Sequence, residues 1–324
     1  MFAVRGMAVC FSIFFILYCA LSLSVCLLWR RVWLYGQKGS ARHCADLLFA
    51  LRIVPFVVAT AGTLFVAVPS FLLLEPRAVK ESTGVLSLGL GFCGIVLMLA
   101  GVWKATAALV RASRTIARWS REACTIGCSP SDSGKSISVL RAPAAAVPLT
   151  AAGILKPRLW LSSAAEFLLT QRELHSALRH EVAHVRRRDN LRKLLLCLVP
   201  FLGMSRLESA WREATEMAAD DAAVSNASEA LDLAAAVIKL SRIVPSELPV
   251  ELTTALVHSP GQSVNARVER LLAWTERQQQ PANRYWFGGS LCAMAAMLAM
   301  LAMMAVYYTE LLVRVHAATE WLVR

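Results

Sequence analysis

Residues 170–190 read TQRELHSALRHEVAHVRRRDN and contain the pattern His-Glu-x-x-His, in which His180 and His184 are four positions apart. Residues at this spacing lie on one face of an α-helix, so both imidazole rings can bind a single cation. Glu181 then lies beside that cation, where it can accept a proton from a bound water molecule. The pattern is typical of catalytic zinc sites, so the sequence predicts Zn²⁺ as a cofactor, His180 and His184 as metal ligands and Glu181 as the catalytic base.

The residues on either side of the pattern predict that it is helical. Thr170 and Glu173 match the capping box S/T-x-x-E, which begins a helix by satisfying its first backbone N–H groups. This helix would run through both histidines to about Arg188. Apolar residues at helical spacing give it a face that can pack on a core, and these are Leu174, Ala177, Leu178, Val182 and Val185.

A catalytic zinc site needs one more protein ligand besides the two histidines. Glu216 and Asp220 are four positions apart in a predicted helix at residues 208–223, so both carboxylates lie on one helical face. We expect Glu216 to be the third ligand and Asp220 to accept the ring N–H of a ligand histidine, which fixes its tautomer. Glu213, one turn earlier, remains open as the alternative ligand.

The predicted site implies peptide-bond hydrolysis. Zinc lowers the pKa of bound water, and Glu181 can pass the proton that it accepts to a leaving amine. His258, in the sequence His-Ser-Pro, is a candidate donor to the oxyanion that forms in this reaction. The alternative interpretation of His258 is a histidine in a surface loop.

The chain is strongly apolar, with hydrophobic residues at 57% of its 324 positions. Four uncharged stretches reach the length of about 20 residues that a membrane-spanning helix needs, and they cover residues 7–29, 53–74, 82–103 and 285–309. The first stretch is too long for a signal peptide and has no cleavage site after it, so we interpret it as a membrane helix. The sequence therefore predicts an integral membrane protein with four spans, in contact with the lipid bilayer.

The net charge of +12 follows the membrane spans. Basic residues cluster after the first span and after the third, and these are Arg30, Arg31, Lys38, Arg42, Arg52, Lys104, Arg111, Arg114, Arg118 and Arg121. The positive-inside rule places both clusters in the cytoplasm, which puts the N- and C-termini outside a multi-pass protein of the inner membrane. We expect the basic run at residues 111–121 to lie along the inner headgroups. No nucleic-acid-binding motif accompanies the charge, so we expect no direct nucleic-acid partner.

Three regions follow from this topology. Residues 1–110 form a membrane region with three spans, residues 111–284 form a cytoplasmic α+β zinc-peptidase domain, and residues 285–324 form the fourth span and a short external tail. The overall class is a mainly α membrane protein.

Within the middle region, short strands are expected at residues 136–141 and 146–150, after a loop at 128–135. A further β-type run begins at Pro157, which we expect at a sheet edge because proline lacks a backbone donor. The apolar stretch at 194–204 is too short to span a bilayer and predicts a buried or re-entrant hairpin.

Two of the nine cysteines, Cys124 and Cys128, are four positions apart. This spacing could serve metal binding or redox sensing. The interpretation that we favour is two reduced cysteines in a cytoplasmic linker.

Residues 146–272 resemble the BlaR/MecR-type membrane zinc metallopeptidases, a family of antibiotic-sensing signal transducers. The matching pieces are the Gly153…Pro157 strand run, the capping box, the run from His180 to Asn190, and Glu216-x-x-Ala219-Asp220. The resemblance implies a gluzincin-like zinc endopeptidase with His180, His184 and Glu216 as ligands and Glu181 as base. Asp189, in the basic run after the motif, is expected behind the ligands together with Asp220.

The resemblance also implies a regulatory role, with a cytoplasmic or membrane-proximal protein such as a transcriptional repressor as the substrate. Sensor members carry a penicillin-binding domain after the last span, whereas this chain ends at Arg324, so we expect no direct sensing of β-lactams. A homodimer is left open.

Two alternatives remain. The heat-shock and CAAX-prenyl membrane proteases, which serve quality control, resemble this chain in the His-Glu-x-x-His and later Glu-x-x-x-Asp patterns. Their His-Pro…Arg segment is similar to His258-Ser259-Pro260…Arg267, although the Arg-Arg-Arg-Asp run favours the first family. A non-catalytic signal transducer with a structural metal is the other alternative, and Glu181 argues against it because a structural site needs no base.

Overall fold

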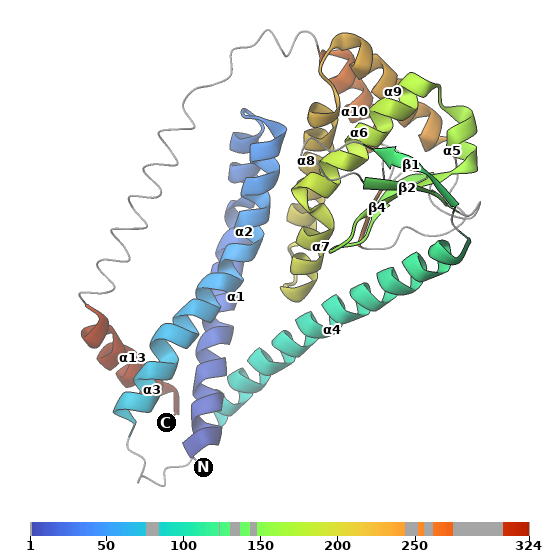
Figure 1. Ribbon diagram of the computed structural model, residues 1–324. Coiled ribbons are helices and arrows are strands. Elements are labelled where there is room, and N and C mark those ends of the chain that lie inside the picture. Colours follow the sequence, from blue (N-terminus) through green and yellow to red (C-terminus); the bar gives the residue numbers. More distant parts are fainter. Residues whose placement is uncertain are drawn as a thin grey trace.

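The computed structural model describes residues 2–75, 84–122, 124–129, 137–142, 148–243, 252–255, 262–274 and 307–323. Within these ranges the chain is mostly helical, and three helices are long and apolar enough to cross a membrane. A small sheet and several shorter helices gather at one end of the long helices (Figure 1). The predicted class of a mainly α membrane protein is therefore confirmed. The fourth predicted span, residues 285–309, lies outside the described residues except for its last three positions.

The first three predicted spans coincide with the apolar parts of the long helices. Their bounds are α1 (Phe2–Gly36), α2 (Ala41–Gly62) with its continuations η1 (Thr63–Ala67) and α3 (Val68–Leu74), and α4 (Val85–Glu122). Ser40 begins α2 by accepting a hydrogen bond from the backbone N–H of His43. Each of these three helical segments is thus longer than the apolar stretch from which the span was predicted.

The π-helical turn η1 lies directly before Pro69. Proline has no N–H to donate to the carbonyl four residues back, and its ring would clash there in a regular α-helix. At this point Val68 donates to the carbonyl of Thr63, five residues back, so the backbone widens by one residue per turn. The helix therefore passes the proline without ending.

Helix α4 continues without a break from its apolar part into the basic run at residues 111–121. Its 38 residues make it about 57 Å long, whereas the hydrocarbon core of a bilayer is about 30 Å thick. The basic run was expected along the inner headgroups. In the structure it continues the spanning helix and packs against the sheet, because Trp119 is buried on Trp160 with ring centroids 5.5 Å apart.

The described sheet has five strands in the order β1-β2-β4-β3-β5. Strands β2 and β4 are parallel, and the other neighbours are antiparallel. The bounds are β1 (Cys124–Ser129), β2 (Ile137–Ala142), β3 (Leu149–Ala152), β4 (Arg158–Ser162) and β5 (Thr253–Ala255). Three of these strands match the expected β-type runs, although β3 begins three residues later than the expected start at 146.

Two strand predictions are wrong. Cys124 and Cys128 lie in β1 and pair with Arg141 and Ser138, so this segment is a strand rather than a linker. Pro157 was expected at an edge, but β4 lies between β2 and β3. The proline comes just before Arg158, the first paired residue of β4, so its missing N–H leaves the ladder intact.

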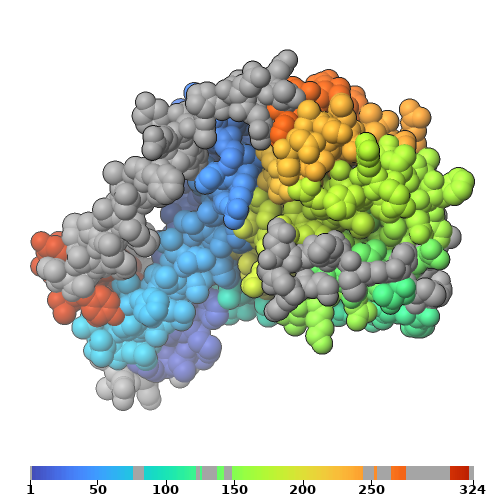
Figure 2. All heavy atoms as spheres, turned by 45° about the horizontal axis from the view of Figure 1, so that its top comes forward, coloured from blue at the N-terminus to red at the C-terminus, as the bar shows by residue number. Residues whose placement is uncertain are grey.

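Helices cover both faces of the sheet. One face packs on helices α6, α9 and α10 in an apolar core that includes Leu149, Leu161 and Leu233. We call the sheet and helices α5 to α10 the sheet domain. Its helices are α5 (Ser163–Leu168), α6 (Gln171–Arg187), α7 (Asp189–Leu198), α8 (Ser205–Ala223), α9 (Ala227–Ser241) and α10 (Gln262–Leu272). Figure 2 shows this domain packed against one half of the long helices, while α3 stands apart from it.

Helices α7 and α8 join the sheet domain to the membrane helices. Helix α8 packs on α2 through Leu48, Trp211 and Ala214. The apolar stretch at 194–204, predicted as a buried or re-entrant hairpin, forms the end of α7 and the turn into α8. This turn rests on α1, since the hydroxyl of Tyr18 donates to the carbonyl of Pro200 at 3.0 Å.

The last described helix, α13 (Tyr308–Val323), lies at the opposite end of the long helices from the sheet domain (Figure 1). Ser70 of α3 donates to the carbonyl of Leu312 at 2.8 Å, and Tyr308 donates to the carbonyl of Phe65 at 2.7 Å. The start of α1 is at the same end, where Arg5 pairs with Glu75 at 3.1 Å. The two termini therefore share one end of the bundle.

Candidate metal centre

Helix α6 begins at the predicted capping box. The Thr170 side chain accepts from the backbone N–H of Glu173 at 3.4 Å, and the Glu173 carboxylate accepts from the backbone N–H of Thr170 at 2.8 Å. Lys239 of α9 also donates to this carboxylate at 2.7 Å. The start of the helix that carries both histidines is thus fixed to the core.

Helix α6 ends where Arg188 adopts a left-handed backbone conformation with φ of 55°. This conformation is uncommon outside glycine, and it breaks the helix at a single residue. Asp189 then begins α7, and its Oδ2 lies 2.7 Å from Nδ1 of His184. The sharp break therefore turns the Asp189 carboxylate back toward the histidine one turn earlier.

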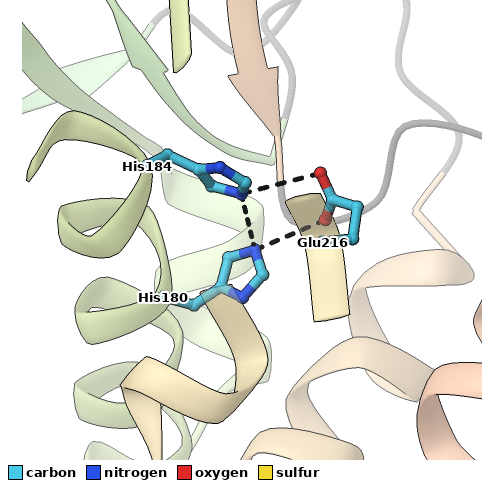
Figure 3. A group of neighbouring side chains, drawn as sticks. All are labelled: His180, His184 and Glu216. Carbon is cyan, nitrogen blue, oxygen red and sulfur yellow. Dashed lines mark hydrogen bonds and ion pairs between the residues drawn. The ribbon is translucent and has the colours of Figure 1, made fainter. Parts of the chain in front are cut away.

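The structure brings His180, His184 and Glu216 together (Figure 3). The two Nε2 atoms are 3.1 Å apart. Glu216 Oε2 lies 3.5 Å from Nε2 of His180, and Oε1 lies 3.6 Å from Nε2 of His184. Both histidines are fully buried, and Glu216 reaches them from α8. Three potential ligand atoms thus point at one place from two helices.

A carboxylate lies behind each histidine. Asp220 Oδ1 is 2.9 Å from Nδ1 of His180, and Asp189 occupies the equivalent position on His184. A carboxylate at Nδ1 holds the ring proton there and leaves the Nε2 lone pair for a metal. Both aspartates lie where the sequence predicts them.

Glu181 is completely buried beside His180. The backbone N–H of Ala151, in β3, donates to its Oε2 at 3.1 Å. Asn190 donates to the carbonyl of the same Ala151 at 3.2 Å, which ties the start of α7 to this strand. The sheet therefore positions the expected base from the side opposite its own helix.

Arg267 of α10 completes the cluster, and the sequence analysis assigns it no role. Its Nε and Nη2 donate to the two carboxylate oxygens of Asp220 at 2.8 and 2.7 Å. Its Nη1 lies 3.1 Å from Glu216 Oε2, and the residue is only 5% exposed. A signal was available in the sequence, because Arg267 shares the apolar face of α10 with Val264, Val268 and Leu271.

The charges of the cluster shift each other's pKa values. Burial opposes protonation of His180, but hydrogen bonds to Asp220 and Glu216 outweigh it and raise its pKa to about 9. Burial would raise the pKa of Glu216, but His184, His180 and Arg267 lower it to about 2. Arg267 and His180 likewise hold the pKa of Asp220 well below its usual range against the effect of burial. Without a metal, the carboxylates are therefore ionised and His180 carries a proton that a metal must displace.

The structure does not place the other two predicted site residues, Glu213 and His258, at the metal centre. Glu213 is exposed and lines a surface hollow together with Trp29 and Trp33 of α1, so it does not reach the histidines. The structure thus favours Glu216 over Glu213 as the third ligand. His258 lies outside the described residues.

The donor set fits a zinc ion. Ligands at about 2.05 Å from a tetrahedral ion are about 3.3 Å apart. The two histidine nitrogens are 3.1 Å apart, and each lies 3.5 or 3.6 Å from one of the two Glu216 oxygens. Two imidazole nitrogens and one carboxylate oxygen leave a fourth position open, as catalytic zinc sites require. Neither the models of known protein families nor the curated protein sequences give a match to this chain. Its function must therefore be argued from these residues.

Proposed function

We propose that this chain is a membrane-anchored zinc-dependent endopeptidase. The observation that carries the proposal is the convergence of His180, His184 and Glu216 at separations suited to one tetrahedral ion. The buried Glu181 lies next to this point on the same helix. A purely structural zinc site has four protein ligands and needs no base, so the arrangement favours catalysis.

Each residue of the candidate site would have a distinct role in this reaction. His180, His184 and Glu216 hold the zinc ion, which when bound lowers the pKa of water and polarises a substrate carbonyl. Glu181 accepts the proton of the attacking water and delivers it to the leaving amine. Asp220 and Asp189 keep the histidines in the tautomer that binds metal, and Arg267 neutralises Asp220 and orients Glu216.

The arrangement of the helices supports a cytoplasmic site close to the membrane of an inner-membrane protein. The basic residues after the first and third spans lie toward the sheet domain, whereas both termini lie at the opposite end (Figure 1). By the positive-inside rule, the sheet domain faces the cytoplasm. The substrate is then a cytoplasmic protein or the cytoplasmic segment of a membrane protein.

The resemblance to BlaR/MecR-type peptidases supports a regulatory cleavage, with a transcriptional repressor as one candidate substrate. Quality-control proteolysis is the second candidate, and Arg267 favours it. This arginine belongs to the segment that resembles the heat-shock and CAAX-type proteases, and it contacts both Asp220 and Glu216. A regulatory enzyme cuts one protein at one site, whereas a quality-control enzyme degrades many unfolded membrane proteins, so mass spectrometry of the products distinguishes them.

The first test compares wild type with Glu181→Gln in purified full-length protein. We expect the variant to keep its zinc, measured by mass spectrometry of the metal, and to lose about 10²- to 10⁴-fold in cleavage of β-casein and of itself. A variant that keeps both zinc and full proteolysis would rule out Glu181 as the base.

The second test uses two glutamates of one helix. Glu216→Gln should lower zinc occupancy strongly, because glutamine supplies a neutral and weaker ligand. Glu213→Gln is the matched control, since Glu213 lies on α8 away from the histidines. Zinc loss in the control but not in Glu216→Gln would reassign the third ligand.

A further inference from the structure

A cavity of about 750 Å³ lies between the membrane helices and the sheet domain, apart from the three potential metal ligands. We call it the cationic cavity. Five basic side chains and one carboxylate line it, together with apolar residues of α7, α8 and the turn between them. The basic residues are Arg52, Lys104, Arg111, Lys193 and Arg212, and the carboxylate is Glu208.

Two residues that line this cavity, Arg52 and Trp211, carry buried donor atoms. Arg52 is 1% exposed and donates from Nε to Glu208 at 3.1 Å and from Nη2 to the carbonyl of Val199. Within the described ranges, neither Nη1 of Arg52 nor Nε1 of Trp211 has a hydrogen-bond partner, although Trp211 is also buried. A buried donor without a partner destabilises the fold, and more so when it is charged. Both residues line the cavity, and a ligand with acceptor oxygens that reached these two donors would supply the missing hydrogen bonds.

The charge of the cavity indicates that this ligand is an anion. Among the described residues, six charged side chains line it, of which Glu208 is the single carboxylate, and this carboxylate already pairs with Arg52. Lys193 donates to the carbonyl of Thr253 at 2.6 Å. A bound anion would balance part of the excess positive charge around the cavity.

The position of the cavity indicates a membrane lipid. Lys104 follows the apolar part of α4, and Arg52 precedes the apolar stretch of α2 at 53–74. The turn between α7 and α8 touches the membrane helices at the same level, because a Cβ on Gly101 would lie 2.9 Å from Cδ of Pro200. Leu202, on this turn, is 93% exposed. The cavity thus lies where apolar helix surface meets basic surface, which is the depth of lipid headgroups.

We propose that the cationic cavity binds the phosphate headgroup of an anionic phospholipid from the cytoplasmic leaflet. The phosphate oxygens would accept from Arg52 and Trp211 and lie among the remaining cations. The apolar lining, which includes Leu196, Phe201 and Leu202, would contact the beginning of the acyl chains. This proposal does not depend on the peptidase function.

The test is native mass spectrometry of the full-length protein in detergent, titrated with dioleoylphosphatidylglycerol or dioleoylphosphatidylcholine. Wild type should bind a single phosphatidylglycerol molecule more tightly than phosphatidylcholine. Lys104→Gln should weaken binding about fivefold and Trp211→Phe about tenfold, through loss of one charge and one donor respectively. These variants are preferred to Arg52→Gln, which would break the ion pair with Glu208 and endanger folding.

Arg31→Gln is the matched control, because Arg31 is an exposed cation after the first span and does not line the cavity. Its affinity for phosphatidylglycerol should equal that of wild type. Equal affinity of wild type for both lipids, or unchanged affinity in both cavity variants, would overturn the proposal. Displacement of the lipid by inorganic phosphate alone, or by a polyglutamate peptide, would reassign the site to a soluble anion or to an acidic peptide.

Discussion

The candidate metal centre and the cationic cavity are two charged regions that share helix α8, and they differ in the balance of their charges. At the metal centre, Arg267 gives hydrogen bonds to both oxygens of Asp220 and lies 3.1 Å from Glu216. At the cavity, Arg52 pairs with Glu208 and a backbone carbonyl, but its Nη1 has no partner within the described ranges. Opposite charges that pair within the chain fix the geometry of a site, whereas an excess of one sign favours a ligand from outside the chain.

The largest expected loss of stability comes from a substitution at the candidate metal centre. Arg267→Met leaves the buried Asp220 carboxylate without its main counter-charge, so the free energy of unfolding should fall by about 3–5 kcal/mol. Denaturant unfolding in detergent, followed by tryptophan fluorescence, measures this loss.

Arg270→Met is the control for this change on the same helix. Arg270 pairs with Asp221 at 2.6 Å, but the two side chains remain 21% and 34% exposed. Its loss should cost about 1 kcal/mol or less, because water screens the pair. Equal losses in the two variants would mean that burial of the Arg267–Asp220 pair does not set its energy.

Removal of zinc should cause the next largest decrease in the free energy of unfolding. At a free zinc concentration one hundred times Kd, the metal should add about 2.7 kcal/mol to the free energy of unfolding, and chelation should remove this increment. Lys104→Gln, in the cationic cavity, should leave the increment unchanged. A zinc increment that this variant abolishes would contradict the separation of the two regions.

The zinc increment should also depend on pH. The pKa of His180 in the folded, metal-free protein is raised to about 9 from an ordinary value of 6.5. Its protonation therefore stabilises the metal-free fold fully below pH 6.5, and this contribution is lost as pH rises through 9. At a fixed free zinc concentration, the zinc increment in the free energy of unfolding should therefore grow between pH 6.5 and pH 9. Zinc titrations at several pH values can measure this change.

The smallest effect concerns the start of α6. Glu173→Gln removes the carboxylate that accepts from Thr170 and Lys239, and should cost about 1–2 kcal/mol. Because these hydrogen bonds lower the pKa of Glu173 despite its burial, the stabilisation is present above the unfolded value of 4.5 and is lost as pH falls through the folded pKa. Glu166→Gln, at a more exposed pair with Arg141, should change stability little. A loss from Glu173→Gln that persists at low pH would point to packing instead of charge.

Local rules of sequence correctly predict several elements. The capping box fixes the start of α6, and uncharged length identifies α1, α2–α3 and α4. Local sequence patterns do not predict a strand that forms only because it pairs with a neighbouring strand. Strand β1 contains no clear alternation, and its pairing with β2 is what makes it a strand.

The sequence by itself determines that His180 and His184 share a helical face, because a spacing of four requires it once the helix forms. It also determines three apolar spans and their basic flanks. Only the tertiary structure decides that Glu216 reaches these histidines while Glu213 faces α1, since that choice depends on the rotation of α8 against α6. It likewise brings Arg267 to Asp220 and leaves Arg52 incompletely paired, because contacts between residues far apart in the chain arise from packing and not from local spacing.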